Sequence, residues 1–349
     1  MFRLAREVLE TETTLLEMKE HFMPRSASLL AAAALTTLAT MAAHAASIYN
    51  FVTVNGSGDN GGGTTINAIS NSGALVGFST NANQTVLTNF VRNANGTFGV
   101  LNINNDPLAN ANGINANGVV VGTTAGQAFS DQSGLVTLLP AVAPGDTASE
   151  TAFGINDQGM IVGQFVQNST DTSPGFVDIN GQFTVLNPVA NTFATNAQSI
   201  NNQGIVAGFY DTDGEHQHGF LYNTNTKRYT LLADPVQPNL FLTQFLGIND
   251  NGIAVGYWQD AGGNQHGFLY NIATQSYTFL DEPNAGFSGG IEITQITGIN
   301  DANEIAGFYV GSDGVQRGFF ATAAAPEPAS MALIGVGLAG LAWMRRRRC

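Results

Sequence analysis

The sequence predicts an all-β repeat protein, and within that class a six-bladed β-propeller closed by its own N-terminal strand. Three observations support this fold class. A motif of eleven residues, GINDNGIAVGY from Gly247 to Tyr257, occurs in six variant copies along the chain. Each repeat has room for four short strands, and the sixth repeat lacks the last of them. A segment near the N-terminus has the composition of that missing strand.

The repeats are 41 to 51 residues long, a spacing typical of propeller blades. One isoleucine marks the same point of every copy. Its positions are Ile69, Ile114, Ile155, Ile200, Ile248 and Ile299. A second phrase, such as HGFLYNIATQSYTFL from His266, follows most copies. Each unit therefore predicts two hairpins, and the alternative to a propeller is an open β-solenoid or a tandem array.

The first hairpin of each unit is predicted to turn at a polar residue followed by a glycine. The Asn or Ser after the isoleucine can cap this turn with its side chain. The turn glycine is replaced once, by Asn303, and asparagine is the non-glycine residue that best tolerates a positive φ. A second glycine on the return strand never varies, which indicates a β-bulge or a close backbone approach. The turn glycines are Gly73, Gly118, Gly159, Gly204 and Gly252, and the strand glycines are Gly77, Gly122, Gly163, Gly208, Gly256 and Gly307.

The ring is predicted to close through residues Ile48 to Val54. The sixth unit stops at Gly318-Phe319-Phe320-Ala321 without a fourth strand, and Ile48 to Val54 is similar to the Tyr-Thr-Leu-Leu strand of other units. A first segment that completes the last blade removes exposed edges that invite aggregation. The predicted repeat domain of six units covers residues 47–322.

The segment before the repeats has the features of a secretory signal peptide, at residues 23–46. Arg25 provides a charged start, an apolar stretch follows, and Ala43 and Ala45 form a small-x-small cleavage site. Residues 1–22 are rich in Glu and Leu. A translation start assigned too far upstream explains them, with Met23 as the true start, and a long signal n-region is the alternative.

The other end, residues 323–349, is a tail of three parts. Pro326, Glu327 and Pro328 precede an uncharged run from Ala329 to Met344, which is close to the lower limit for spanning a membrane. Four arginines follow and would hold that end in the cytoplasm. They are Arg345, Arg346, Arg347 and Arg348. A plain C-terminal anchor is the alternative to a processed tail.

This order of parts resembles the PEP-CTERM sorting signal of Gram-negative bacteria, whose tail is thought to be processed by an exosortase. The resemblance implies export, transient anchoring in the inner membrane, and processing by an exosortase-type enzyme. It further implies a final location at the cell surface or outside the cell, frequently in bacteria that make exopolysaccharide.

The repeats also resemble the HAF repeat of bacterial extracellular proteins. The matching triplets begin at His218, His266 and Arg317, each followed by Gly-Phe, and Gln127-Ala128-Phe129 is a further version. The resemblance covers roughly residues 66–320. It implies an exported β-rich repeat protein and supplies no assigned catalysis.

No combination of residues in the sequence indicates catalysis, so we expect no enzyme activity, metal or cofactor. His216 and His218 lack a third zinc ligand at suitable spacing. Asp211 and Asp213 faintly resemble a calcium loop, but the downstream bidentate glutamate is missing, so ordinary turn chemistry is favoured. The acids at Asp281-Glu282 belong to the repeat pattern.

The charge balance favours an extracellular protein and argues against nucleic acid as a partner. Only 11% of the residues are charged, and the formal net charge is −14. Residues 47–325 hold four basic residues against 20 acidic ones, with no basic stripe that could neutralise phosphates. Tyr210, Tyr257 and Trp258, beside polar turns, could stack on neutral sugars.

The predicted function is that of an exported, non-catalytic repeat protein that binds glycan or a surface protein in an exopolysaccharide or biofilm matrix. The alternative is an extracellular polysaccharide-acting enzyme, a lyase or a hydrolase, on the same propeller. Such an enzyme should break the repeat symmetry with unlike acids and bases at one mouth of the central channel.

Overall fold

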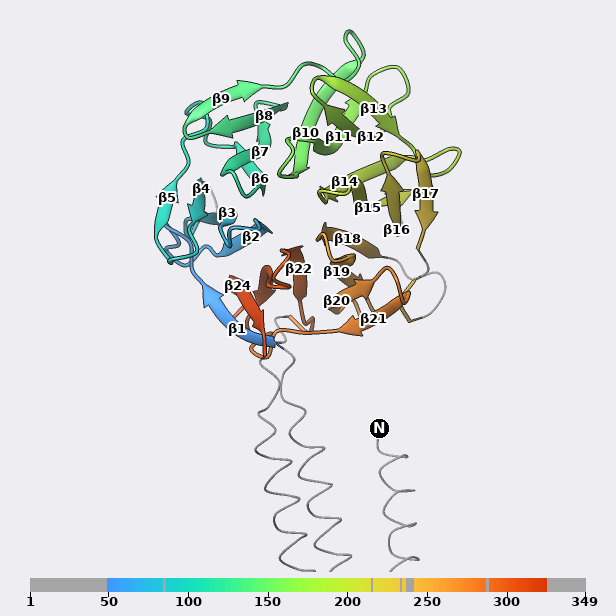
Figure 1. The fold of residues 1–349 in the computed structure, drawn as a ribbon. Helices are drawn as coiled ribbons and strands as arrows, with labels where there is room; N and C mark the ends of the chain where they lie inside the picture. The colour runs from blue at the N-terminus through green and yellow to red at the C-terminus, as the bar shows by residue number, and fades with distance from the viewer. Residues whose placement is uncertain are drawn as a thin grey trace, which may run out of the picture. The chain divides into compact units, whose positions relative to one another are not determined.

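The computed structural model describes residues 49–324, apart from residues 84, 85, 215, 233, 237–241, 287 and 288. Within these limits, Tyr49–Ala323 is one compact unit of 24 strands. The strands form six four-stranded antiparallel sheets, which surround a central axis as the blades of a propeller (Figure 1). In this part of the chain, no helix is long and apolar enough to cross a membrane. The predicted fold class is confirmed.

Five blades are built from consecutive strands, numbered here from the axis outward. Blade 1 contains β2 (Thr64–Ile69), β3 (Leu75–Thr80), β4 (Leu87–Arg92) and β5 (Phe98–Val100). Blade 2 contains β6 (Asn110–Ile114), β7 (Val119–Thr124), β8 (Gln127–Gln132) and β9 (Leu135–Leu138). Blade 3 contains β10 (Thr147–Ile155), β11 (Ile161–Gln167), β12 (Gly175–Ile179) and β13 (Gln182–Leu186).

The remaining blades repeat this order, except that the last one takes its outer strand from the N-terminus. Blade 4 contains β14 (Ala194–Ile200), β15 (Ile205–Asp211), β16 (His218–Asn223) and β17 (Arg228–Leu231). Blade 5 contains β18 (Thr243–Ile248), β19 (Ile253–Gln259), β20 (Gln265–Asn271) and β21 (Ser276–Phe279). Blade 6 contains β22 (Thr294–Ile299), β23 (Ile305–Val310), β24 (Gln316–Ala323) and β1 (Tyr49–Val54).

The ring closes where β1 pairs with β24, from Tyr49 opposite Ala323 to Val54 opposite Gly318. The buried Tyr49 hydroxyl donates a hydrogen bond to the carbonyl oxygen of Asn303 at 2.9 Å. The ring of Phe51 packs edge-on against Phe319, with centroids 5.2 Å apart. The prediction that the N-terminal strand completes the sixth blade is confirmed, and the open alternatives are excluded by this pairing.

The unvarying strand glycine lies opposite a phenylalanine in every blade, for example Gly256 opposite Phe268. A Cβ atom on Gly256 would overlap the carbonyl oxygen of Gln244 and press on the Phe268 ring. The first strand of each blade also shifts register beside this glycine, as a β-bulge does. Bulge and close approach, which the sequence offered as alternatives, therefore occur together. The six opposing phenylalanines, all fully buried, are Phe90, Phe129, Phe176, Phe220, Phe268 and Phe319.

The turn of the first hairpin requires a left-handed backbone conformation, as predicted. The φ angle of Gly252 is +74°, and Asn303, the single replacement, adopts +58°. Because the same turn occurs in every blade, the turns of all six inner hairpins lie at the same end of the central axis.

Candidate functional site

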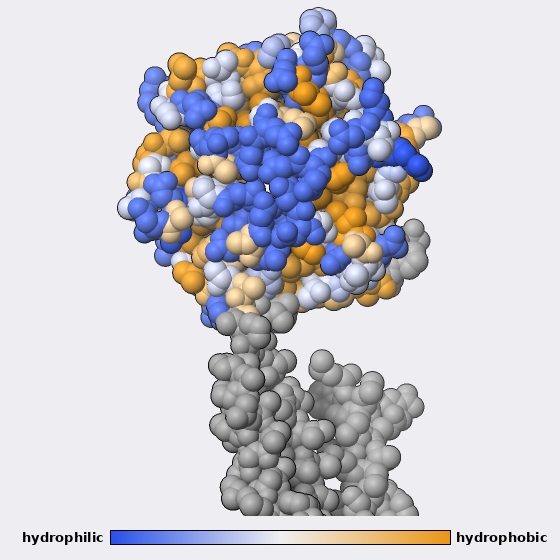
Figure 2. All heavy atoms as spheres, in the orientation of Figure 1, coloured by the Kyte–Doolittle hydropathy of each residue, from blue (hydrophilic) through white to orange (hydrophobic). Residues whose placement is uncertain are grey.

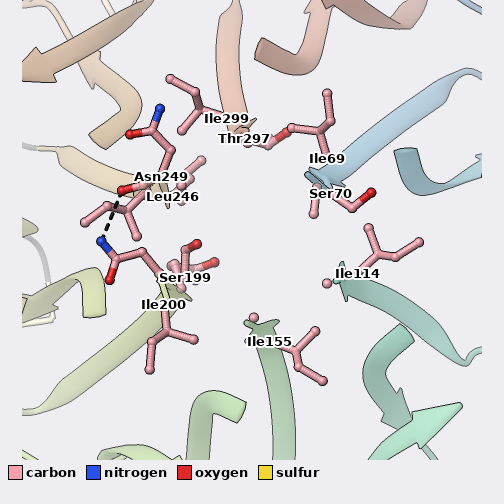
Figure 3. A pocket seen from close by; sticks show the side chains of 18 of the residues that line it. Ile69, Ser70, Ile114, Ile155, Ser199, Ile200, Leu246, Asn249, Thr297 and Ile299 are labelled. Carbon is pink, nitrogen blue, oxygen red and sulfur yellow. Dashed lines mark hydrogen bonds between the residues drawn. The ribbon is translucent and has the colours of Figure 1, made fainter. Parts of the chain in front are cut away.

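The six inner strands surround an axial cavity of about 290 Å³ (Figure 3). These strands are β2, β6, β10, β14, β18 and β22. On the face seen in Figure 2, hydrophilic residues gather around the axis, and hydrophobic residues are more frequent toward the outer strands. The cavity is built from successive rings of residues that occupy equivalent positions in the repeats.

The first ring, which we call the amide ring, consists of the asparagines that follow the isoleucine of each repeat. The Asn156 Oδ1 accepts hydrogen bonds from the backbone N–H groups of Gln158 and Met160, at 3.1 and 2.9 Å. Its Nδ2 donates to the carbonyl oxygen of Asn201 in the next blade, at 3.0 Å. The dashed line at Asn249 in Figure 3 marks another such bond. The amide ring contains Asn115, Asn156, Asn201, Asn249 and Asn300.

The turn cap predicted from the sequence is thus confirmed, and its second role was missed. Each asparagine caps its own turn and also ties its blade to the following one. A turn cap alone accepts several residue types, so the recurrence of asparagine at this position is a sequence signal for the second role. Ser70 occupies the place in blade 1, where its hydroxyl bonds within its own turn. No amide of this ring therefore crosses from blade 1 to blade 2 among the described residues.

A second ring, the mouth ring, consists of the next residue of each turn. The backbone N–H of Asp157 donates to the Asn202 Oδ1 at 2.9 Å, and that of Asn202 donates to the Asp250 Oδ1 at 2.7 Å. The Asn71 Nδ2 reaches past blade 2 to the Asp157 Oδ2, at 3.0 Å. Carboxylates at this mouth are therefore held by hydrogen bonds. The mouth ring contains Asn71, Ala116, Asp157, Asn202, Asp250 and Asp301.

The mouth ring moves the pKa values of two of its carboxyls in opposite directions. Burial raises the pKa of Asp301, and the neighbouring Asp250 and Asp157 carboxylates raise it further. Burial also opposes ionisation of Asp157, but hydrogen bonds from Ala116, Asn202 and Asn71 outweigh it and lower the pKa of this carboxyl. At neutral pH, Asp157 therefore holds its negative charge more firmly than Asp301 does.

Small residues let the six inner strands converge on the axis. A Cβ atom on Gly154 would come within 2.7 Å of the Gln198 carbonyl oxygen, and one on Gly298 within 3.0 Å of the Ile69 backbone nitrogen. These contacts leave no room for a larger residue without a shift of the backbone. The six positions are Ala68, Gly113, Gly154, Ser199, Gly247 and Gly298.

The residue just before each small one lines the cavity and differs between most blades. In blades 1, 2 and 6 its polar side chain donates to the next blade, as Asn67 does to the Ala111 carbonyl oxygen at 2.8 Å. In blades 3 to 5 the equivalent residues are Phe153, Gln198 and Leu246, so Gln198 comes from the blade between the other two. We call these six positions the variable ring, which contains Asn67, Asn112, Phe153, Gln198, Leu246 and Thr297.

The variable ring breaks the repeat symmetry, and sequence reasoning missed it. An alignment on the constant residues does not distinguish this position from positions that vary without consequence. The variable ring is thus the position at which the repeated framework differs from blade to blade along the cavity wall. Its residues are neutral. Because Asn67, Asn112 and Thr297 donate to the next blade, the amide of Gln198 and the apolar surfaces of Phe153 and Leu246 are the groups that this ring can offer.

The histidine and aspartate candidates of blade 4 lie at a hairpin end, away from this cavity. The Asp211 Oδ1 accepts the Gly214 backbone N–H at 3.1 Å, and the Asp213 Oδ2 lies 2.7 Å from the His216 Nδ1. His218 stands 3.6 Å from Asp234. Within the described ranges, no three His, Cys, Asp or Glu side chains are grouped so that they could hold a metal ion. Asp211 and Asp213 thus make turn contacts of the kind that the sequence favoured over a calcium loop.

The blade 5 histidine forms a cluster that the sequence did not reveal. The His266 Nδ1 lies 2.9 Å from the Asp281 Oδ2, and its Nε2 lies 3.6 Å from the Asp260 Oδ2. The indole of Trp258 covers the imidazole, with ring centroids 4.9 Å apart. Burial lowers the pKa of His266, but the two carboxylates outweigh burial and raise it. Asp281 thus pairs with a histidine fifteen positions earlier in the chain.

The predicted processing sites lie outside the described residues. This applies to the signal cleavage site at Ala43 and Ala45 and to Pro326, Glu327 and Pro328. It also applies to the apolar run and to the four arginines, Arg345, Arg346, Arg347 and Arg348.

A comparison with known protein families finds a match in the C-terminal tail. Residues 324–348 match the PEP-CTERM protein-sorting motif. The chain therefore carries the recognition signal of an exosortase, and this signal implies an exported protein with a C-terminal sorting segment. The resemblance of the repeats to the HAF family stays a prediction. A search of curated proteins finds no match to the chain.

Solved structures with a similar fold share little sequence with this chain. TolB from Acinetobacter baumannii has a TM-score of 0.41 and 11% identity over 73% of this chain, which spans about half (53%) of that chain. A neuraminidase-like protein from A/bat/Guatemala/164/2009 has a TM-score of 0.47 and 11% identity, over 80% of this chain and 96% of that one. A fucose-specific lectin from Aleuria aurantia has a TM-score of 0.36 and 11% identity, over 67% and 77%. Similarity at this level carries no argument about ligands.

Proposed function

We propose that this is an exported, non-catalytic binding protein that acts at the cell surface or in an exopolysaccharide or biofilm matrix after an exosortase has processed its tail. Its axial cavity takes a neutral, hydroxyl-rich ligand, such as the end of a glycan. The PEP-CTERM motif supports the export and the processing. The variable ring supports the binding.

The chemistry of the variable ring suits a sugar. Side-chain amides such as Gln198 both donate and accept hydrogen bonds, which matches the paired hydroxyls of a sugar ring. Phe153 and Leu246 flank this amide in the ring and offer apolar surface to the C–H face of a sugar. A volume of about 290 Å³ is at the lower end for ligand pockets, so a small ligand or a chain end fits.

The mouth ring favours a second candidate, an enzyme that acts on extracellular polysaccharide. Hydrolases of this kind use one protonated and one ionised carboxyl, set apart by their surroundings. The pKa of Asp301 is raised and that of Asp157 is lowered, which is the direction in which the two carboxyls of such a pair diverge. Against this reading, the Asp157 carboxylate already accepts hydrogen bonds from Ala116, Asn71 and Asn202, which would compete with catalysis.

An array of neutral oligosaccharides, followed by calorimetric titration of the best one, tests the binding proposal. We expect Gln198→Ala and Phe153→Ala each to weaken affinity about tenfold or more, the equivalent of one lost hydrogen bond or ring contact. Gln203→Ala removes an exposed amide outside the cavity and should bind like the wild type. Equal affinity in all variants would refute the assignment of the cavity.

Release of new reducing ends from the same oligosaccharide separates the two candidates. The binding proposal expects none, and it expects Asp301→Asn to bind as the wild type does. Turnover that Asp301→Asn abolishes would instead establish the enzyme and overturn the non-catalytic reading.

A further inference from the structure

The outer strands of the six blades form a nearly uncharged belt around an acidic molecule. They contain one charged residue, Arg228, and no acid, although residues 47–325 contain 20 acids. Within the described part of the chain, each outer strand pairs with one other strand of its sheet, so its second edge is the outer edge of the blade. These edges also expose apolar side chains, among them Val52, Val100, Leu135, Val185, Leu231 and Phe279.

Five of these strands carry protection that natural edge strands commonly use. They are only three to five residues long, and β17 starts at the charged Arg228. Short length and charge both discourage pairing with another chain. The sixth, β1, has six residues without a charge, a proline or a bulge, and its register with β24 is continuous. Its central Val52 is 52% exposed. β1 is therefore the least protected edge of the propeller.

We infer that β1 pairs edge to edge with β1 of a second copy of this chain. In an antiparallel pair with a two-fold axis at Val52, Val52 lies opposite the partner's Val52, and Phe51 lies opposite the partner's Thr53. Two blade 6 sheets then join into one sheet of eight strands, and the pair uses the same surface on both copies, as a closed dimer requires.

The charge distribution supports contact with a second copy along the outer edge of β1. The outer strands themselves carry none of the 20 acids of residues 47–325, so two copies that meet along β1 bring no acid of these strands together. The remaining repulsion is screened over about 8 Å at physiological salt. Dimer formation should therefore increase when salt is raised from low to physiological ionic strength.

Directly opposed cysteines test the register. In a Cys349→Ser background, which removes the native thiol, Val52→Cys places two thiols on facing Cβ atoms about 4.5–5.5 Å apart, close enough for a disulfide after small adjustments. We expect the oxidised full-length chain to run as a covalent dimer on a non-reducing gel. The matched control is Val100→Cys on the short strand β5, which is 63% exposed and should stay monomeric. Failure of Val52→Cys to cross-link, or equal cross-linking by both variants, would overturn the inference.

Sedimentation of uncross-linked protein provides an independent measurement. The wild type should show a dimer that grows with protein concentration, whereas Val52→Lys, which opposes two like charges, should lose it. Val100→Lys should dimerise like the wild type. The melting temperature at high dilution, where all three are monomeric, reports whether each variant is folded. A wild type that stays monomeric up to its solubility limit would also overturn the inference.

Discussion

Removing one asparagine of the amide ring measures how much these side chains hold the blades together. Asn201 is 5% exposed, and its Oδ1 accepts the backbone N–H of Ile205 at 2.8 Å. Its Nδ2 donates to the carbonyl oxygen of Asn249 in blade 5, at 3.1 Å. Asn201→Ala therefore leaves one backbone N–H without its acceptor and one carbonyl oxygen without its side-chain donor.

The two losses set the magnitude. A buried polar group deprived of its partner costs about 1–3 kcal/mol, and a carbonyl oxygen, with two lone pairs, falls toward the lower end. We therefore expect Asn201→Ala to lower the free energy of unfolding by about 2–4 kcal/mol. At about 2 °C per kcal/mol for a domain of this size, the melting temperature falls by roughly 4–8 °C.

Differential scanning calorimetry with two companion variants checks the reasoning. Asn201→Ser keeps an acceptor for the turn, as the Ser70 hydroxyl does for the Ala74 backbone N–H at 3.1 Å, and loses the donor to blade 5. Its melting temperature should therefore lie between those of the wild type and Asn201→Ala. Gln203→Ala removes the hydrogen bond that an exposed side-chain amide makes to the same neighbouring blade. The free energy of unfolding should change by no more than about 0.5 kcal/mol. If Asn201→Ala is no worse than Gln203→Ala, the amide ring does not stabilise the propeller as described.

Three further predictions address the seam, the pH dependence and the tail. Ser70→Asn should raise stability by about 0.5–1.5 kcal/mol in chemical denaturation, because its amide can reach the Asn115 carbonyl oxygen and complete the ring; an unchanged midpoint would contradict this. Burial raises the pKa of the Glu150 carboxyl above its ordinary 4.5, so the folded protein loses stability as the pH rises through the raised pKa. Glu150→Gln should therefore be more stable than the wild type at pH 7 but not below pH 4.5. Melting curves at both pH values would show this difference. Replacing Glu327 and Pro328 with Ala should trap the full-length chain in the inner membrane of an exosortase-bearing host, and normal release in cell fractionation would refute the sorting hypothesis.

The sequence was sufficient to predict the blades because their determinants are local or repeated. Gly252 and Asn303 reveal the turn conformation through residue type alone, and the missing fourth strand of the sixth unit points to the N-terminal segment. The tie between Asn156 and Asn201 was not predicted, because a turn cap already accounts for the asparagine. Only the ring arrangement shows that its Nδ2 meets the next blade.

The candidate site was harder to predict because its residues share a position and not a type. Phe153, Gln198 and Leu246 look unrelated in the sequence, and only the convergence of the inner strands makes them neighbours around one cavity. The pairing of His266 with Asp281 was missed for a similar reason. Both residues fit the repeat pattern, and the sequence does not tell which loop folds back onto the hairpin.

The pairing of β1 with β24 also fixes an order of events during export. Blades 1 to 5 consist of consecutive strands, so each can assemble as soon as its own hairpins have crossed the membrane. The Tyr49 hydroxyl, by contrast, must wait for Asn303, 254 residues later in the chain. The first strand to arrive outside is thus the last to find its place, and contacts of such sequence separation form slowly. Because the sorting motif begins at residue 324, directly after β24, the strand that receives β1 and the signal that directs processing are adjacent in the chain.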